Sequence, residues 1–292
     1  MIEILRWILK VDIVVFAVFS MCFVGLNHTI QEVVSPLKVP RKVINAVLAN
    51  FILVPLYVFL ILQIIPLERS YSIGFMLVAL AAGAPSLIKL TITAGENVAR
   101  STALLILLLP VTIVYMPLLI PVIIPGVDVS ARVIATPLIV TMLIPLIIGF
   151  LIKAFLPKII HRIKPIFRVV PTITLVLLIV LTFIVNFRSI IDILGNRVIV
   201  TAVIVILGAF GIGYLLGWPD ITSRNILGLG TAQRNIAAAT VAATQAFTDS
   251  DILVVVVLTS LVGLLLLFPI AKILRKREER YYEAHPDHIK GK

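Results

Sequence analysis

Apolar stretches of about twenty residues follow one another almost without interruption from Val11 to Leu274. An α-helix needs a stretch of that length to cross the hydrocarbon core of a bilayer, which is about 30 Å thick. The chain of 292 residues is 61% hydrophobic and only 13% charged, with a mean hydropathy of +1.17. Soluble domains are about half apolar and about a quarter charged. We therefore predict an all-α, polytopic membrane protein.

Polar breaks divide the chain into about nine predicted transmembrane helices. Many breaks combine glycine or proline with charged residues, as in "PLER", "AGEN" and "GWPDITSR". After the last helix, residues 275–292 form a polar tail, which we expect to begin as a frayed helix and to continue as disorder. The predicted helices are residues 11–28, 42–65, 71–94, 98–124, 131–156, 169–190, 198–217, 224–247 and 251–274.

Lysines and arginines are distributed unevenly between the predicted helices. If the tail is inside and the helices alternate in direction, the basic segments 38–42 and 153–168 lie on the same side as the tail. Cytoplasmic loops collect Lys and Arg, so we predict a cytoplasmic C-terminus and an external N-terminus in the cytoplasmic membrane. The net charge of +11 then reflects this bias and the anionic headgroups of the lipid bilayer. No separate basic domain indicates binding to nucleic acid.

The residues that most membrane enzymes require have no suitable pattern here. The only cysteine, Cys22, lies in an apolar run and can form no intrachain disulfide. The four histidines lie in loops or in the tail, and the predicted helices hold no aspartate pair. Metalloprotease and aspartyl protease sites are thereby excluded. We predict that the protein is not an enzyme, and that it has no metal centre and no organic cofactor.

Two basic residues, Lys89 and Arg234, fall inside predicted helices rather than between them. Lys89 follows the sequence "AAGAPS" in the third helix, and Arg234 lies within "GLGTAQRN" in the eighth. These glycines and the proline interrupt each helix. An interrupted helix exposes backbone N–H and C=O groups that lipid cannot satisfy, so it is tolerated where it lines a cavity or binds a ligand. Charged residues at such depth are costly and indicate a functional site.

The two interrupted helices occupy corresponding places in two halves of the chain. Five helix steps separate them, so they enter the membrane from opposite faces, and each is followed by a short polar turn and a long apolar helix. This pattern predicts an inverted repeat within a single transmembrane transporter domain. The first repeat is residues 11–124, the connector helix is residues 131–156, and the second repeat is residues 169–274.

Four segments also match known motifs in order and spacing: "VGLNHTIQEV", "LANFILVPLYVFL", "GENVARSTALL" and "GTAQRNIAAATVAA". Through them the chain resembles the bile acid:sodium symporter family, from about Val24 to Pro269. The resemblance implies a panel domain and a core domain, with two broken helices crossing in the core. It also implies sodium-coupled uptake of organic anions. The first helix of ten-helix members has no counterpart, as in nine-helix members.

The same resemblance places residues at the family's sodium and substrate sites. Asn50 and Gln233 stand where the family has glutamines that bind sodium, so both are candidate ion-binding residues. Arg234 replaces an asparagine that faces the substrate cavity, and Leu229 stands in place of a glutamate. All fourteen acidic residues are expected near helix ends, in loops or in the tail. We therefore expect depleted sodium machinery, with Na⁺ possible but not required.

Lys89 has two possible roles. Buried without an anion, it could replace the missing cation, together with oxygens of Asn50, Gln233 or Thr91, and could load and release a proton. Alternatively, its side chain reaches an aqueous vestibule and attracts anions.

Arg234 must find hydrogen-bond acceptors because it stays protonated. It lies just before a half-helix that starts near Ile236, where the positive end of the helix dipole adds to its charge. Its planar fork suits a carboxylate or a sulfonate. The alternative is that Arg234 caps carbonyl groups at the break.

These features predict a secondary active transporter of a small organic anion, either sodium-independent or proton-coupled. The candidate substrate-binding residues are Lys89, Arg234, Asn235, Ser86 and Thr91. One alternative is a Na⁺-coupled organic anion symporter whose site is rebuilt from carbonyls, Asn50, Gln233 and Ser86. Another is a membrane anion sensor or scaffold that transports nothing, although the short loops offer no signalling domain. The substrate and the oligomeric state are left open.

Overall fold

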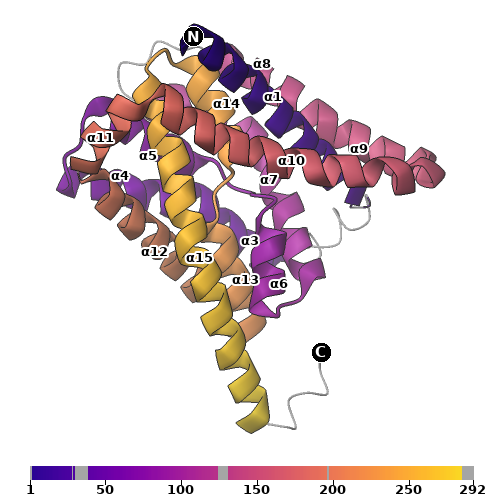
Figure 1. The fold of residues 1–292 in the computed structure, drawn as a ribbon. Helices are drawn as coiled ribbons and strands as arrows, with labels where there is room; N and C mark the ends of the chain where they lie inside the picture. Colours follow the sequence, from indigo (N-terminus) through magenta and orange to yellow (C-terminus); the bar gives the residue numbers. More distant parts are fainter. Residues whose placement is uncertain (1, 28, 30–38, 124–130, 196, 285–292) are drawn as a thin grey trace.

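A computed structural model describes the chain except residues 1, 28, 30–38, 124–130, 196 and 285–292 (Figure 1). The described part consists of helices and short connections and contains no strand. Seven of its helical segments are long and apolar enough to cross a membrane. The prediction of an all-α, polytopic membrane protein is therefore confirmed. Those segments are Ile2–Asn27, Pro40–Ile64, Val98–Ile123, Ala131–Phe155, Pro157–Val185, Val198–Leu216 and Ser250–Arg277.

Two further predicted spans are present as pairs of short helices. The third predicted span consists of α5 (Arg69–Leu80) and α6 (Leu87–Ala94), and the eighth consists of α13 (Ile221–Ala232) and α14 (Ile236–Ala246). Together with the seven continuous segments, they account for each of the nine predicted helices. The continuous segments comprise α1 (Ile2–Asn27), α3 (Pro40–Val47), η2 (Leu48–Leu53), α4 (Val54–Ile64), α7 (Val98–Ile123), α8 (Ala131–Leu138), η3 (Ile139–Leu143), α9 (Ile144–Phe155), α10 (Pro157–Val185), α12 (Val198–Leu216) and α15 (Ser250–Ala284).

The breaks occur where the sequence signals predicted them. Between α5 and α6, Gly83 has a φ of +76°, which L-residues with a side chain rarely adopt. A Cβ atom there would lie 2.8 Å from the backbone nitrogen of Leu109 on α7, so the packing also requires glycine. Between α13 and α14, Asn235 is the N-cap of α14, and its side chain accepts a hydrogen bond from the Ala238 amide at 3.1 Å.

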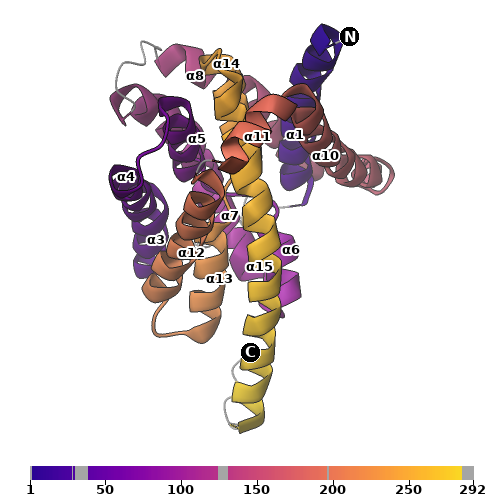
Figure 2. The same cartoon turned by 60° about the vertical axis from the view of Figure 1, so that its left-hand side comes forward.

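The helices form two groups that meet at α14 (Figures 1 and 2). In the first group, α1 packs against both α9 and α10. Gly25 of α1 and Gly149 of α9 allow close backbone approach, because a Cβ on either would lie 2.9 Å from the Cα of the other. In the second group, α12 packs on α13, and α15 packs on α5 and α6. Helix α14 contacts α1 and α8 as well as α5 and α15.

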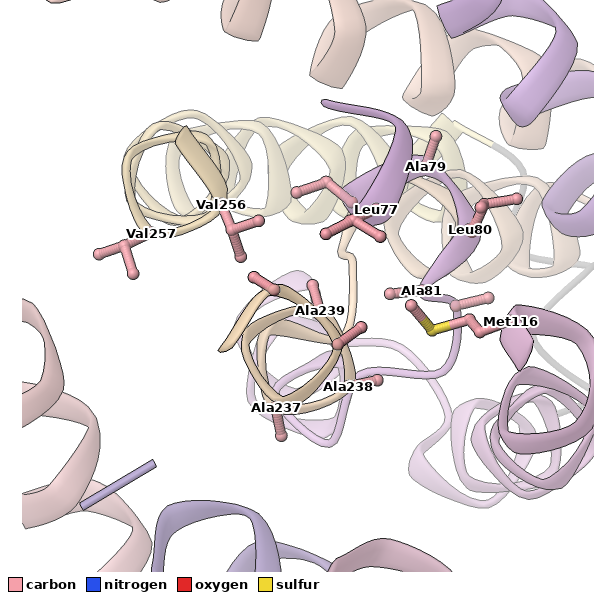
Figure 3. Packing of buried hydrophobic residues seen from close by; sticks show 14 of the residues in the cluster. Leu77, Ala79, Leu80, Ala81, Met116, Ala237, Ala238, Ala239, Val256 and Val257 are labelled. Carbon is pink, nitrogen blue, oxygen red and sulfur yellow. The ribbon is translucent and has the colours of Figure 1, made fainter. Parts of the chain in front are cut away.

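Small residues allow α14 to pack closely against α5 and α15. Figure 3 shows Ala237, Ala238 and Ala239 beside the end of α5, where Leu77, Ala79 and Leu80 are labelled, and beside Val256 of α15. All of these side chains are buried. The tight packing holds the two breaks at fixed positions.

Several predicted boundaries were wrong. Helix α1 starts at Ile2 instead of residue 11, so Asp12 lies inside the helix and not at its end. Helix α10 starts at Pro157 instead of residue 169, and only Leu156 separates it from α9. Hydropathy missed this start because the exposed basic residues of "PKIIHRIKP" occupy the surface of a regular helix.

The predicted break after residue 190 and the polar tail also contain helix. A short helix, α11 (Phe187–Gly195), covers the predicted polar break "RSIIDILGNR" in part. Helix α15 continues to Ala284, so the tail begins as helix, as expected, and residues 285–292 lie outside the described residues. The orientation of the chain ends relative to the membrane stays a prediction. The start of α1 and the end of α15 lie at opposite ends of the molecule in Figure 1, as an odd number of crossings requires.

Candidate functional site

The two breaks contact each other directly through Asn235. Its backbone amide donates to the carbonyl of Ala81 at 2.8 Å, and its Nδ2 donates to the carbonyl of Gly83 at 3.1 Å. The hydroxyl of Thr112 on α7 donates to the carbonyl of Ala82 at 3.0 Å. Three successive carbonyls of the first break are thus satisfied by other segments. The unwound backbone needs no water at these positions.

Arg234 lies beside Asn235 and is the most extensively bonded side chain at the crossing. It is only 4% exposed. Its Nε donates to the carbonyl of Val78 at 3.1 Å. Its Nη1 donates to Asn50 Oδ1 at 2.9 Å and to the carbonyl of Thr231 at 3.1 Å. Its Nη2 donates to the carbonyls of Ala79 and of Asn50, the latter at 3.5 Å.

Three of the five acceptors of Arg234 come from the ends of α5 and α13, the first half-helix of each pair. Val78 and Ala79 lie in the last turn of α5, and Thr231 lies in the last turn of α13. Carbonyl groups in a last turn mostly lack an intrahelical partner and carry partial negative charge. The carbonyl of Val78 also accepts from the Ala81 amide at 3.2 Å. A guanidinium has five N–H donors, and all five have an acceptor here. No N–H of Arg234 is left over for a bound anion.

Asn50 supplies the remaining two acceptors of Arg234, its Oδ1 and its backbone carbonyl. It lies in the π-helix η2 and is fully buried. Its Nδ2 donates to the carbonyl of Ala46 at 3.0 Å and to the hydroxyl of Thr231 at 3.1 Å. These bonds orient its Oδ1 toward Arg234. Asn50, predicted to bind an ion, therefore contacts the guanidinium, and this contact joins the η2 segment to the crossing.

In the described part of the chain, the other predicted site residues make no hydrogen bond to Arg234. Gln233 is buried, and its Oε1 has no hydrogen-bond partner within the described part of the chain. Thr91 is buried, and its hydroxyl donates to the carbonyl of Leu87 in its own helix. Ser86 is half-buried at the start of α6 and makes no side-chain cap.

Lys89 is exposed on α6, so the first of its two predicted roles, which required burial at the crossing, is wrong. The reason is the helical phase. Leu87, Leu90 and Thr91 form the buried face of α6, and Lys89 projects from another side. The second reading, in which Lys89 reaches outward, agrees with this placement.

A separate cavity of about 340 Å³ lies between the ends of α3, α7, α12 and α13. Asp220 on its wall forms ion pairs with Arg100 at 3.0 Å and with Lys42 at 4.0 Å, and accepts a hydrogen bond from Ser223 at 2.7 Å. Burial raises the pKa of Asp220, but the Ser223 bond and the two cations outweigh it and hold that pKa below its usual value. Sequence reasoning did not identify this cluster, because the two cations lie about 120 and about 180 residues from Asp220 in the chain.

Sequence reasoning also missed most of the crossing's acceptors. The carbonyls of Val78, Ala79 and Thr231 carry no side-chain signature, so no pattern could reveal them. Asp12 was overlooked because the predicted first helix began one residue before it. A signal was present, since Asp12 shares its helical face with Leu9 and Phe16 at spacings of three and four residues.

The family model described as the Sodium Bile acid symporter family matches residues 14–193. The matched region includes the first interrupted helix and ends before the second. A comparison with curated proteins finds no match.

Proposed function

The chain belongs to the sodium bile acid symporter family, and on that premise we propose that it is a secondary active transporter of a small organic anion that uses no sodium ion at the helix crossing. One observation carries the second part of the proposal. The guanidinium of Arg234 is buried and bonded to four carbonyl oxygens and to Asn50 Oδ1. The site already contains a cation, and that cation cannot leave.

A sodium ion does not fit beside this guanidinium. A hard cation needs several oxygen ligands, and Asn50 Oδ1 already accepts from Arg234. Two positive charges about 4 Å apart repel by about 4 kcal/mol at an effective dielectric constant of about 20. Leu229, fully buried, supplies no carboxylate to offset this repulsion. Arg234 thus neutralises the helix ends, as a bound cation would. Unlike a bound ion, it does not dissociate in each transport cycle.

The anion must then be bound by other groups. Of the predicted substrate-binding residues, Arg234, Asn235 and Thr91 are buried and use their side chains within the fold. Lys89 and Ser86 are not buried. We propose these two, on the half-helix α6 that follows the first break, as contacts of the anion. The exposed ammonium attracts the anion, and the half-buried hydroxyl can donate to it.

Flux into proteoliposomes tests the proposal. Labelled taurocholate, pyruvate and an aryl sulfonate serve as probes of three anion classes, with external Na⁺ either present or replaced by choline. We expect at least one probe to enter at the same rate in both media. Lys89→Gln should slow this uptake, whereas Lys158→Gln, which removes an exposed lysine from α10, should not. Binding of a probe without flux would show a sensor or scaffold instead.

One observation favours the sodium-coupled alternative. The buried Oε1 of Gln233 has no partner in the described structure, and an oxygen in that position can ligate a cation. If Na⁺ binds there, uptake should rise steeply with external Na⁺, and Gln233→Leu should remove that dependence. Equal rates in sodium and choline would exclude this alternative.

A further inference from the structure

Asp12 is a buried carboxylate inside the first membrane span. It is the eleventh residue of α1, which runs from Ile2 to Asn27, and it is 5% exposed. It belongs to the buried stripe of that helix, with Leu9, Ile13 and Phe16 on the same side. Its Oδ2 has no hydrogen-bond partner in the part of the chain that the structure describes. Buried carboxylates usually have a partner, so this one requires an explanation.

The helices packed against α1 offer Asp12 no counter-charge. These are α9, α10, α14 and η3. Neither α14 nor η3 contains a titratable residue. Lys153, the charged residue of α9, donates to the carbonyl of Asn27, about 22 Å along α1 from Asp12. The charged or titratable residues of α10 are all exposed and lie in its first half: Lys158, His161, Arg162, Lys164 and Arg168.

The charged residues of α1 itself also point away. Glu3, Arg6 and Lys10 are exposed. The residues three and four positions from Asp12, which share its side of the helix, are all apolar: Ile8, Leu9, Val15 and Phe16. An ionised carboxylate without a partner is far more costly to bury than a protonated one. Asp12 therefore holds a proton while it is buried. Exposed Lys10, two residues away, indicates that water lies within one turn of the helix.

We propose that Asp12 carries a proton that is coupled to anion movement, an inference that rests on the proposed transport function. Helix α1 belongs to the group with α9 and α10, and it packs against α14 of the crossing. In many transporters one helix group moves against another. Such a movement would alternately bury Asp12 and expose it to water. The carboxylate takes a proton from one side and releases it on the other, and one proton balances the charge of one monovalent anion.

Infrared spectroscopy of the purified protein tests the protonation state without any substrate. We expect a carbonyl band of a protonated carboxyl at neutral pH, which shifts in D₂O. The band should be missing in Asp12→Asn and retained in Glu3→Gln, which removes an exposed carboxylate from the same helix. A spectrum of Asp12→Asn that equals the wild-type spectrum would overturn the proposal.

Uptake under a pH gradient tests the coupling. With the outside one pH unit more acidic, one proton per anion supports about tenfold accumulation of the transported probe. Asp12→Asn should lose this accumulation but still exchange the probe with probe inside the vesicle, and Glu3→Gln should behave like wild type. Transport that ignores the gradient would overturn the role of Asp12 and leave the proposed function intact. If no probe enters under any condition, both the proposed function and the coupling fail.

Discussion

Replacement of Arg234 by alanine removes the cation that joins the two breaks. It leaves five oxygen acceptors without their donor, at Val78, Ala79 and Thr231 and at two atoms of Asn50. A hydrogen bond to a charged group contributes about 1.5–3 kcal/mol. The loss of folding stability is smaller than the sum of five such bonds, because the variant no longer has to bury a charge. Truncating one partner of a buried charged network typically costs about 3–5 kcal/mol.

Thermal unfolding in detergent measures this loss. At about 2–4 °C per kcal/mol, we expect the Tm of Arg234→Ala to fall on the order of 10 °C. Low concentrations of guanidinium or of Na⁺ should restore part of the loss, because either cation can occupy the space among the oxygens. Tetramethylammonium, which cannot donate hydrogen bonds and is too bulky for this space, is the control. Arg234→Lys keeps the charge but has only three N–H donors. Its Tm should therefore lie between those of the wild-type protein and Arg234→Ala.

Two outcomes would refute this reasoning. If Arg234→Ala unfolds at the wild-type temperature, the guanidinium contributes nothing to the crossing. If the variant is unstable but no small cation restores it, Arg234 acts as packing and not as a substitute for a bound ion. In the wild-type protein, Na⁺ and guanidinium at the same concentrations should not change the Tm.

Three further predictions concern other parts of the molecule. Gly83→Ala should destabilise the protein by about 1–3 kcal/mol, because its positive φ is strained for alanine, whereas Gly211→Ala, where a Cβ meets no atom within 4 Å, should leave the Tm unchanged or slightly higher. The pKa of Asp220 is lower in the folded state than in the unfolded chain. Its ion pairs therefore stabilise the fold at pH values above the pKa of the unfolded chain, and this stabilisation is lost as the pH falls through the pKa of the folded state. The effect should be about 0.2–1 kcal/mol per pair in a pH series of Tm values, and Asp220→Asn should abolish it. For topology, a cysteine introduced at Lys10 should react with an impermeant thiol reagent from outside, and one at Lys276 should react only after the membrane is opened; the opposite pattern would reverse the predicted orientation.

The sequence predicted the architecture well because lipid restricts the solutions. Apolar stretches of about 20 residues must be helices. Gly83 and the triplet around Arg234 are strong local signals, and both breaks lie where they were expected. The starts of α1 and α10 were missed for a single physical reason. Helices continue beyond the apolar region wherever their charged residues can face outward, and hydropathy cannot detect that continuation.

The site was harder to predict because its partners are mostly backbone atoms. Arg234 was recognised as a buried cation, yet nothing in the sequence distinguishes a guanidinium that binds a ligand from one that binds carbonyl groups. That depends on the distance between residues about 156 positions apart, Val78 and Arg234. Lys89 was misplaced because the sequence of an eight-residue helix does not reveal which of its faces is covered. Asp12 was missed because the predicted start of the first helix was wrong, so that the residue was placed at a helix end.

The alanines of α14 have a mechanical consequence. Helices normally interlock because the side-chain ridges of one fit the grooves of the other. At Gly25 and Gly149, α1 and α9 are in backbone contact, so these two helices should move as one body. Helix α14 has short side chains at Ala237–Ala239 and at 242–243, and therefore low ridges. We therefore expect the body that contains α1 and α9 to meet little resistance when it slides along α14. Such a motion leaves the hydrogen bonds of Asn235 unbroken.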